Sequence, residues 1–204
     1  MTRLVVLGSG SKGNALAIEH DGHTLLVDAG FSAREIRRRA AMTGVSLERV
    51  AGIALTHEHG DHTAGAPLLA RDLGVPVACT GGTWSRLRLK MGATQHLPLS
   101  MTTTVELGPF RIEAADISHD ALEPLALAIS TDRASIGVAY ASPRVSHGRS
   151  PAATMLSPLE LFLACERGKS APDVLLRHHQ ALARRGVFAP QPRALGPYVG
   201  RTRI

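Results

Sequence analysis

Residues 56–65 read Thr-His-Glu-His-Gly-Asp-His-Thr-Ala-Gly, and this short stretch contains three histidines and an aspartate at a spacing suited to metal binding. It directly follows an apolar, strand-like run and precedes a helical pattern. His57 and His59 are two residues apart, so an extended backbone points both imidazoles to one side. Asp61 and His62 then lie in the first helical turn. Because zinc and similar ions prefer imidazole and carboxylate ligands, the stretch predicts a metal site where a strand meets a helix.

Two other residues of this stretch have different expected roles. Gly60 is expected to permit the sharp turn from strand to helix. Glu58 alternates with the two flanking histidines and is therefore expected to face solvent rather than a metal ion. The alternative for the whole stretch is a solvated loop with four polar side chains.

A glycine-rich motif near the start of the chain suggests a nucleotide site at first sight. Leu4–Asn14 reads LVVLGSGSKGN and fits the fingerprint G-x-G-x-x-G, and Asp28 follows at the spacing of a ribose-binding acid. A dinucleotide site needs a helix directly after the glycines. Asn14–His20 instead alternates like a strand and ends at the turn pair Asp21-Gly22. We therefore expect strand, glycine loop, strand, tight turn and strand, and no dinucleotide site.

The remaining pattern mixes strands and helices. Strands are predicted at 4–7, 14–20, 23–28, 52–56, 75–79, 110–117, 125–130 and 136–140, and helices at 32–43, 63–73 and 83–91. Adjacent hairpins combined with alternating strands and helices favour a layered α/β architecture over a purely parallel sheet.

With two further motifs, the histidine stretch resembles the metallo-β-lactamase fold superfamily. The pattern H-x-H-x-D-H follows a short strand and is preceded by the V-D-A-G element Val27–Gly30. Within the superfamily, Gly8–Asn14 (G-S-G-S-x-G-N) and Ser118-His-Asp-Ala121 resemble the YycJ/WalJ-like branch, which is related to nucleases. The resemblance covers about residues 3–140. It implies an αββα sandwich with a metal site on one edge, bordered by the glycine loop.

The resemblance also implies which residues hold two divalent metal ions, expected to be zinc or manganese. His57, His59 and His119 would bind the first ion, while Asp61 and His62 would begin the second site. His119 lies at the end of a predicted strand, where the family places its next ligand.

Two aspartates are expected to act near these ligands without binding a metal ion themselves. Asp28 would fix the metal-binding loop by hydrogen bonding, although an ordinary carboxylate at a strand end is the alternative. Asp120 would support a ligand or position a substrate, or else belong to a simple turn. The expected catalytic groups are Asp61 and a metal-bound water, whose pKa a metal ion lowers from about 16 to about 7.

These implications predict a metal-dependent hydrolase, with nucleic-acid phosphodiesters as the expected substrate. One alternative is hydrolysis of a small ester, thioester or cyclic phosphodiester. Another is a catalytically silent remnant that binds metal or nucleic acid. Steep salt dependence without metal dependence would distinguish a silent nucleic-acid binder from a nuclease.

The family pattern breaks near residue 140. The family carries a bridging aspartate close to the position of Ala141 and a final histidine near its C-terminus. Neither Ala141 nor Ser142 can bridge two metal ions. His147 and the pair His178-His179 stand in no recognisable family context, so the second metal site and full activity are in doubt.

We therefore divide the chain into residues 1–140, the N-terminal part of the metallo-β-lactamase-fold domain, and a divergent Pro/Arg-rich tail at 141–204. Residues 1–140 contain 13 Lys+Arg against 14 Asp+Glu, whereas 141–204 contain 10 against 3. The basic character thus belongs to the tail. The C-terminal half of the fold is expected to be incomplete or divergent, through a shifted reading frame, a truncation or true divergence.

Composition limits the setting in which this protein works. With 204 residues the chain is long enough for one domain with a substantial core. Two cysteines without a C-x-x-C arrangement suit a reducing cytoplasm. No apolar run approaches the roughly 18 residues that span a membrane, and the N-terminal run is too short for a signal peptide. The oligomeric state is left open.

Overall fold

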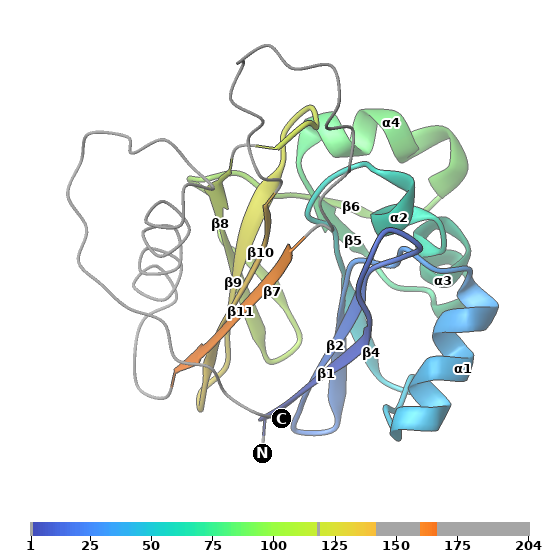
Figure 1. The fold of residues 1–204 in the computed structure, drawn as a ribbon, viewed down its shortest axis with the longest axis vertical. Helices are drawn as coiled ribbons and strands as arrows, with labels where there is room; N and C mark the ends of the chain where they lie inside the picture. Colours follow the sequence, from blue (N-terminus) through green and yellow to red (C-terminus); the bar gives the residue numbers. More distant parts are fainter. Residues whose placement is uncertain (1, 118, 142–159, 167–204) are drawn as a thin grey trace, which may run out of the picture.

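Two β-sheets packed face to face form the centre of the molecule, and helices cover the outer face of one of them (Figure 1). This computed structural model describes residues 2–117, 119–141 and 160–166. Among these residues no helix is long and apolar enough to cross a membrane.

The first sheet contains six strands in sequential order, β1 to β6. They are β1 (Thr2–Gly8), β2 (Ala15–His20), β3 (His23–Val27), β4 (Val50–Ala54), β5 (Val77–Cys79) and β6 (His96–Pro98). The first three are antiparallel neighbours, and β3 to β6 pair in parallel. Antiparallel pairing of β1 with β2 through the glycine loop confirms that this segment lacks a Rossmann crossover.

Four helices accompany this sheet: α1 (Ala33–Thr43), α2 (Gly60–Thr63), α3 (Ala66–Leu73) and α4 (Gly81–Met91). Ser32 caps α1 by accepting a hydrogen bond from the Glu35 amide, and Gly44 ends this helix in the left-handed conformation. The helix predicted at 63–73 is confirmed as α3, which begins three residues later, at Ala66, and Thr63 ends the short helix α2 instead. Pro67 lies in the first turn of α3, where a proline is tolerated.

The second sheet is antiparallel, in the order β11-β10-β9-β8-β7. Its strands are β7 (Val105–Leu107), β8 (Phe110–Asp116), β9 (Leu125–Ser130), β10 (Ser135–Ala141) and β11 (Glu160–Glu166). The hairpin predicted between 125–130 and 136–140 is confirmed as β9 and β10. The short strands β6 and β7, and the edge strand β11, were not predicted.

Alternation along β2 shows how the sequence builds two cores. Ala15 and Ala17 pack in the cluster beneath the helices, whereas Leu16 and Ile18 pack in the cluster between the sheets. Small side chains therefore meet the helices, and large ones fill the space against β8, β9 and β10. Both faces of this strand are buried, as a sheet in the middle of a layered fold requires.

The expected α/β metallo-β-lactamase architecture is confirmed for the described residues, which form the helix, sheet and sheet layers. The expected second outer helix layer lies outside the described residues. β11 follows the proposed boundary at residue 140 and pairs with β10 along seven positions. The division into 1–140 and 141–204 stays a prediction.

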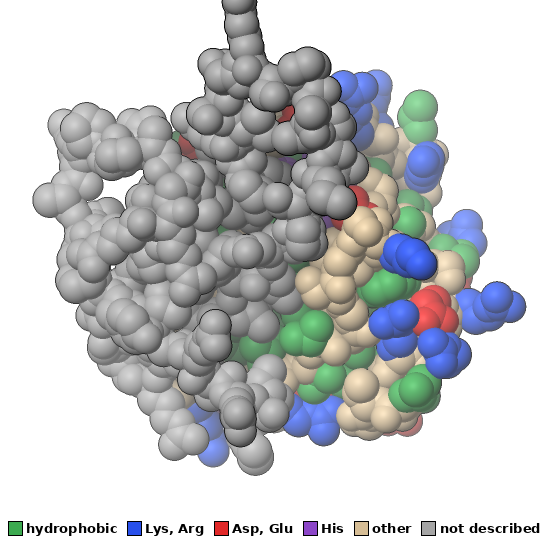
Figure 2. Space-filling view, in the orientation of Figure 1, with side chains coloured by type: hydrophobic (Ala, Val, Ile, Leu, Met, Phe, Trp, Pro, Cys, Tyr) green, Lys and Arg blue, Asp and Glu red, His purple; other side chains and the backbone are tan. Residues whose placement is uncertain are grey.

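Charges on the helical side are mixed. Figure 2 shows Lys and Arg side chains beside acidic ones on this part of the surface. Arg38 and Arg39 both bind Glu35, and Arg37 pairs with Asp72. These arginines are thus engaged with carboxylates on the surface of the protein itself.

The glycine of the V-D-A-G element is required by a close backbone approach. A Cβ at Gly30 would lie 1.6 Å from the carbonyl oxygen of Asp61. Gly60, by contrast, has open space around its Cβ position and no positive φ, so the expectation that the turn needs this glycine is wrong.

We expect Gly30→Ala to destabilise the protein by about 2 kcal/mol or more, because backbone must move to accept the methyl group. Gly60→Ala, a change of the same size at the first residue of α2, should alter the free energy of unfolding by no more than about 0.5 kcal/mol. Urea unfolding of both variants measures the difference. Equal losses would contradict the close approach.

Candidate metal centre

His57 and His59 lie on the loop that follows β4 at the edge of the first sheet. His57 is fully buried, as is the preceding Thr56. His59 is more exposed and occupies the N-cap position of α2. The extended run from β4 into α2 thus places two imidazoles at the sheet edge, as the spacing predicts.

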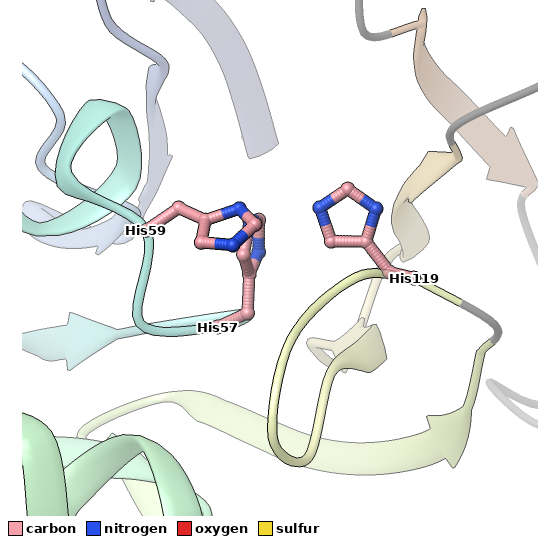
Figure 3. A group of neighbouring side chains, drawn as sticks. All are labelled: His57, His59 and His119. Atoms are coloured by element: carbon pink, nitrogen blue, oxygen red, sulfur yellow. The ribbon is translucent and has the colours of Figure 1, made fainter.

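His119 reaches the same place from the second sheet, on the loop after β8 (Figure 3). Its ring centroid lies 4.5 Å from that of His57 and 5.2 Å from that of His59. One ring nitrogen from each histidine lies within 4.8 Å of the others. Three imidazoles that follow strands of two sheets therefore converge closely enough to hold one metal ion.

Asp28 determines the orientation and tautomer of His57 through Thr56. Its carboxylate accepts hydrogen bonds from the Thr56 amide (2.9 Å) and hydroxyl (2.9 Å to Oδ2). Since the hydroxyl proton goes to Asp28, its oxygen can accept from Nδ1 of His57, 3.0 Å away. His57 therefore carries its proton on Nδ1 and has an unprotonated Nε2.

The surroundings of this Nε2 atom test whether the three histidines are suited to a metal ion. The atom is buried and has no hydrogen-bond partner among the described residues. Burial, followed by the neighbouring His62, His119 and His59, lowers the pKa of His57 far below its ordinary value. The imidazole is thus neutral, with a buried lone pair beside two further imidazoles, which is the state that a metal ligand needs.

His62 shares the Asp28 carboxylate but is engaged differently. Its Nδ1 lies 2.8 Å from Oδ2 of Asp28 and donates to it, because a carboxylate only accepts. Its Nε2 lies 3.1 Å from the side-chain amide nitrogen of Asn14. The ring is 4.0 Å from that of His57, centroid to centroid. His62 thus borders the three-histidine group, but Asn14 contacts the nitrogen that a second metal ion would use.

Asp61 and Asp120, to which the sequence assigned roles near the metal ions, differ in their surroundings. Asp61 accepts from Asn14 (3.2 Å) and lies 3.6 Å from Nε2 of His62, so it belongs to the same polar group. Asp120 is exposed, and its charge raises the pKa of His119 against the larger lowering effect of burial. The roles assigned to both residues stay predictions.

Sequence reasoning assigned no role at the site to two residues beside the histidines, Asn14 and Tyr140, and it did not find the partner of Glu58. Asn14 is fully buried, and its amide nitrogen contacts both Asp61 and His62. Tyr140 is fully buried with its ring 4.5 Å from that of His62, and burial followed by the Asp28 charge raises its pKa well above the ordinary value. Glu58 lies outside the group of three histidines, as expected, but it is half-buried and accepts a hydrogen bond from the Leu122 amide.

Fold and site together define an α/β sandwich with a histidine cluster suited to a metal ion at one edge. The sequence profile described as the Metallo-beta-lactamase superfamily matches residues 8–118, more than half of the chain. The chain therefore belongs to the metallo-β-lactamase superfamily. This confirms the family predicted from the motifs, and the His57, His59 and His119 group is consistent with the metal site of that superfamily.

Several characterised proteins are similar to this chain. The exodeoxyribonuclease YycJ of Bacillus anthracis is 36% identical over 123 residues, covering 59% of this chain and 47% of the relative. The exodeoxyribonuclease WalJ of Streptococcus pneumoniae is 36% identical over 124 residues, covering 58% and 46%. The chain thus spans about half the length of these relatives. Among solved structures, the metallo-β-lactamase-fold protein YhfI of Bacillus subtilis has a TM-score of 0.54 at 18% identity, covering 64% of this chain and 58% of that one.

We expect Asp28→Ala to weaken zinc affinity by roughly 10–100-fold, because the hydrogen bonds that orient His57 and His62 are lost. Competition with a chromogenic chelator measures the affinity. Asp72→Asn, which removes a surface carboxylate, should leave it unchanged, and the His57→Ala/His59→Ala double variant should bind little zinc. Unchanged affinity in a folded Asp28→Ala protein would make Asp28 an ordinary strand-end carboxylate.

The lowered pKa of His57 predicts how stability depends on pH in the metal-free chain. At pH values below the ordinary histidine pKa of about 6.5, His57 binds a proton in the unfolded chain but stays neutral where it is buried in the folded chain. Stability should therefore fall as pH falls below this value, by up to about 1.4 kcal/mol per pH unit for this group.

Urea unfolding between pH 7 and pH 5 measures this slope, and His57→Gln should reduce it. His23→Gln serves as the control, because His23 begins β3 and lies outside the histidine group. An identical slope in the parent and His57→Gln would show that His57 takes up its proton in the folded state.

Proposed function

We propose that this protein is a metal-dependent phosphodiesterase that acts on nucleic acid. The observation that supports this most directly is the buried Nε2 of His57, which has no hydrogen-bond partner among the described residues and belongs to a ring beside those of His59 and His119. The similarity to exodeoxyribonucleases supports nucleic acid as the substrate. A silent nucleic-acid-binding remnant is the alternative that the experiment below distinguishes.

His57, His59 and His119 would hold the first divalent ion, zinc or manganese. When bound, such an ion supplies an activated water at neutral pH and polarises a phosphoryl oxygen. Asp28 and Thr56 keep the proton of His57 on Nδ1 and so keep Nε2 available. Asp61, only partly buried beside the group, is suited to accept a proton from the attacking water or to hold a second ion.

We further propose that any second metal ion binds weakly in this chain. Asn14 already contacts Nε2 of His62 and the carboxylate of Asp61. Ala141, near which the family places its bridging aspartate, has no ligand atom. Without that carboxylate, two like-charged ions close together lack the group that neutralises them and fixes their distance.

We therefore expect residues 1–204 to hydrolyse phosphodiesters slowly. Loss of a second ion that stabilises attacking and leaving oxygens costs several kcal/mol of transition-state stabilisation, and a tenfold loss of rate corresponds to about 1.4 kcal/mol. Cleavage should accordingly be at least about 100-fold slower than that by the Bacillus anthracis relative assayed alongside. Ala141→Asp alone should not restore the rate.

The assay uses end-labelled DNA and RNA strands with zinc, manganese or magnesium. Residual cleavage should disappear in His57→Ala and persist in His23→Ala, which excludes a contaminating nuclease. A rate equal to that of the relative would contradict the weak second site. Salt-sensitive binding without any metal-dependent cleavage would favour the silent remnant.

A further inference from the structure

Glu58 lies between two proposed metal ligands yet points to a different part of the molecule. Its Oε1 accepts a hydrogen bond of 2.8 Å from the backbone amide of Leu122. Leu122 belongs to the loop 119–124, which begins with His119 and leads from β8 to β9. One strand end thus contributes two imidazoles to the histidine group and, from the residue between them, a carboxylate to the loop that supplies the third.

The geometry of an extended segment explains this arrangement. Successive side chains point to opposite sides, so the carboxylate between His57 and His59 cannot join the group that they form. It is nevertheless long enough to reach the neighbouring loop. One extended backbone conformation therefore explains both why His57 and His59 join the histidine group and why Glu58 reaches the loop 119–124.

Two further hydrogen bonds hold the same loop and a third holds the start of β9 directly after it, and none of the three involves a residue between the ligands. The Glu123 carboxylate accepts from the Gly82 amide (2.7 Å) at the start of α4, and its carbonyl accepts from Thr80 (3.2 Å). The Leu125 amide donates to the carbonyl of Thr56 (2.9 Å). Of these four hydrogen bonds, the one between Glu58 and Leu122 lies nearest to His119 along the chain.

The other carboxylate oxygen of Glu58 shows that this side chain is more than a surface group. Oε2 is buried and has no hydrogen-bond partner among the described residues. Burying a carboxylate oxygen without a partner costs free energy. The hydrogen bond that Oε1 accepts from the Leu122 amide offsets this cost.

We propose that Glu58 is a positioning residue that holds the loop 119–124 so that His119 meets His57 and His59. This inference rests on the proposed metal centre, because its consequence is the correct placement of the third ligand. Glu58 acts through the Leu122 amide and binds neither the metal ion nor the substrate. Gln at this position retains a carbonyl oxygen that can accept the same bond, whereas Ala removes it.

The first arm of the test measures the contact itself in the metal-free protein. Amide hydrogen exchange of Leu122 should accelerate at least tenfold in Glu58→Ala and stay within about threefold of the parent in Glu58→Gln. Glu48→Ala, which truncates an exposed glutamate, should have no effect. Unchanged exchange in Glu58→Ala would overturn the proposal regardless of any metal binding.

The second arm measures the consequence with cobalt(II), whose visible spectrum reports its ligands. Glu58→Ala should weaken cobalt affinity by roughly 10–100-fold and reduce the absorption typical of tetrahedral coordination, and Glu58→Gln should restore most of both. In a His119→Ala background, Glu58→Ala should have no further effect, because its only route to the metal ion is gone.

Additive losses in that double variant would show that Glu58 acts on stability in general, and they would overturn its positioning role. Rapid exchange of Leu122 together with unchanged cobalt affinity would do the same. If the parent protein binds no cobalt, the metal centre itself is wrong, and the exchange arm still decides whether Glu58 holds the loop.

Discussion

A single buried carboxylate connects the parts of this structure that must fit together for a metal centre to form. Asp28 follows β3, adopts a left-handed backbone conformation (φ 57°) and is fully buried. It accepts hydrogen bonds from Thr56 after β4 and from His62 in α2. Because an acceptor-only group fixes where its partners carry their protons, Asp28 sets the tautomers of His57 and His62 as well as the path of the loop.

Close backbone packing also holds together the edge of the sandwich where the three histidines meet. Asn14 donates its amide to the carbonyl of Asp61 (2.7 Å), and Gly30 donates to the carbonyl of Asn14 (2.9 Å). The glycine loop, the V-D-A-G element and the histidine stretch thus interlock through main-chain contacts. Two glycines of the motif that resembles a nucleotide fingerprint belong to this packing, since a Cβ at Gly8 or Gly13 would approach the Phe31 ring within 2.6 Å.

Local patterns predicted most of the fold, and they failed where the deciding contact is distant in sequence. Alternation and turn residues were enough for β2, β3 and their Asp-Gly turn. Spacing alone placed His57 and His59 on one side. Alternation indicated that Glu58 points away from the histidines, but it could not show that Leu122, sixty-four residues later, lies there. Asn14 was missed for the same reason, since its contacts with Asp61 and His62 join two loops that are remote along the chain.

The polar group beside the three histidines distinguishes His57 from its neighbour His62. The lone pair of His57 is buried and has no partner, whereas that of His62 receives the amide of Asn14. The first arrangement gains free energy when an ion binds, because an unsatisfied buried atom becomes satisfied. The second must first give up a hydrogen bond. The difference in partners between two neighbouring histidines therefore favours occupancy of the His57, His59 and His119 group over occupancy beside His62.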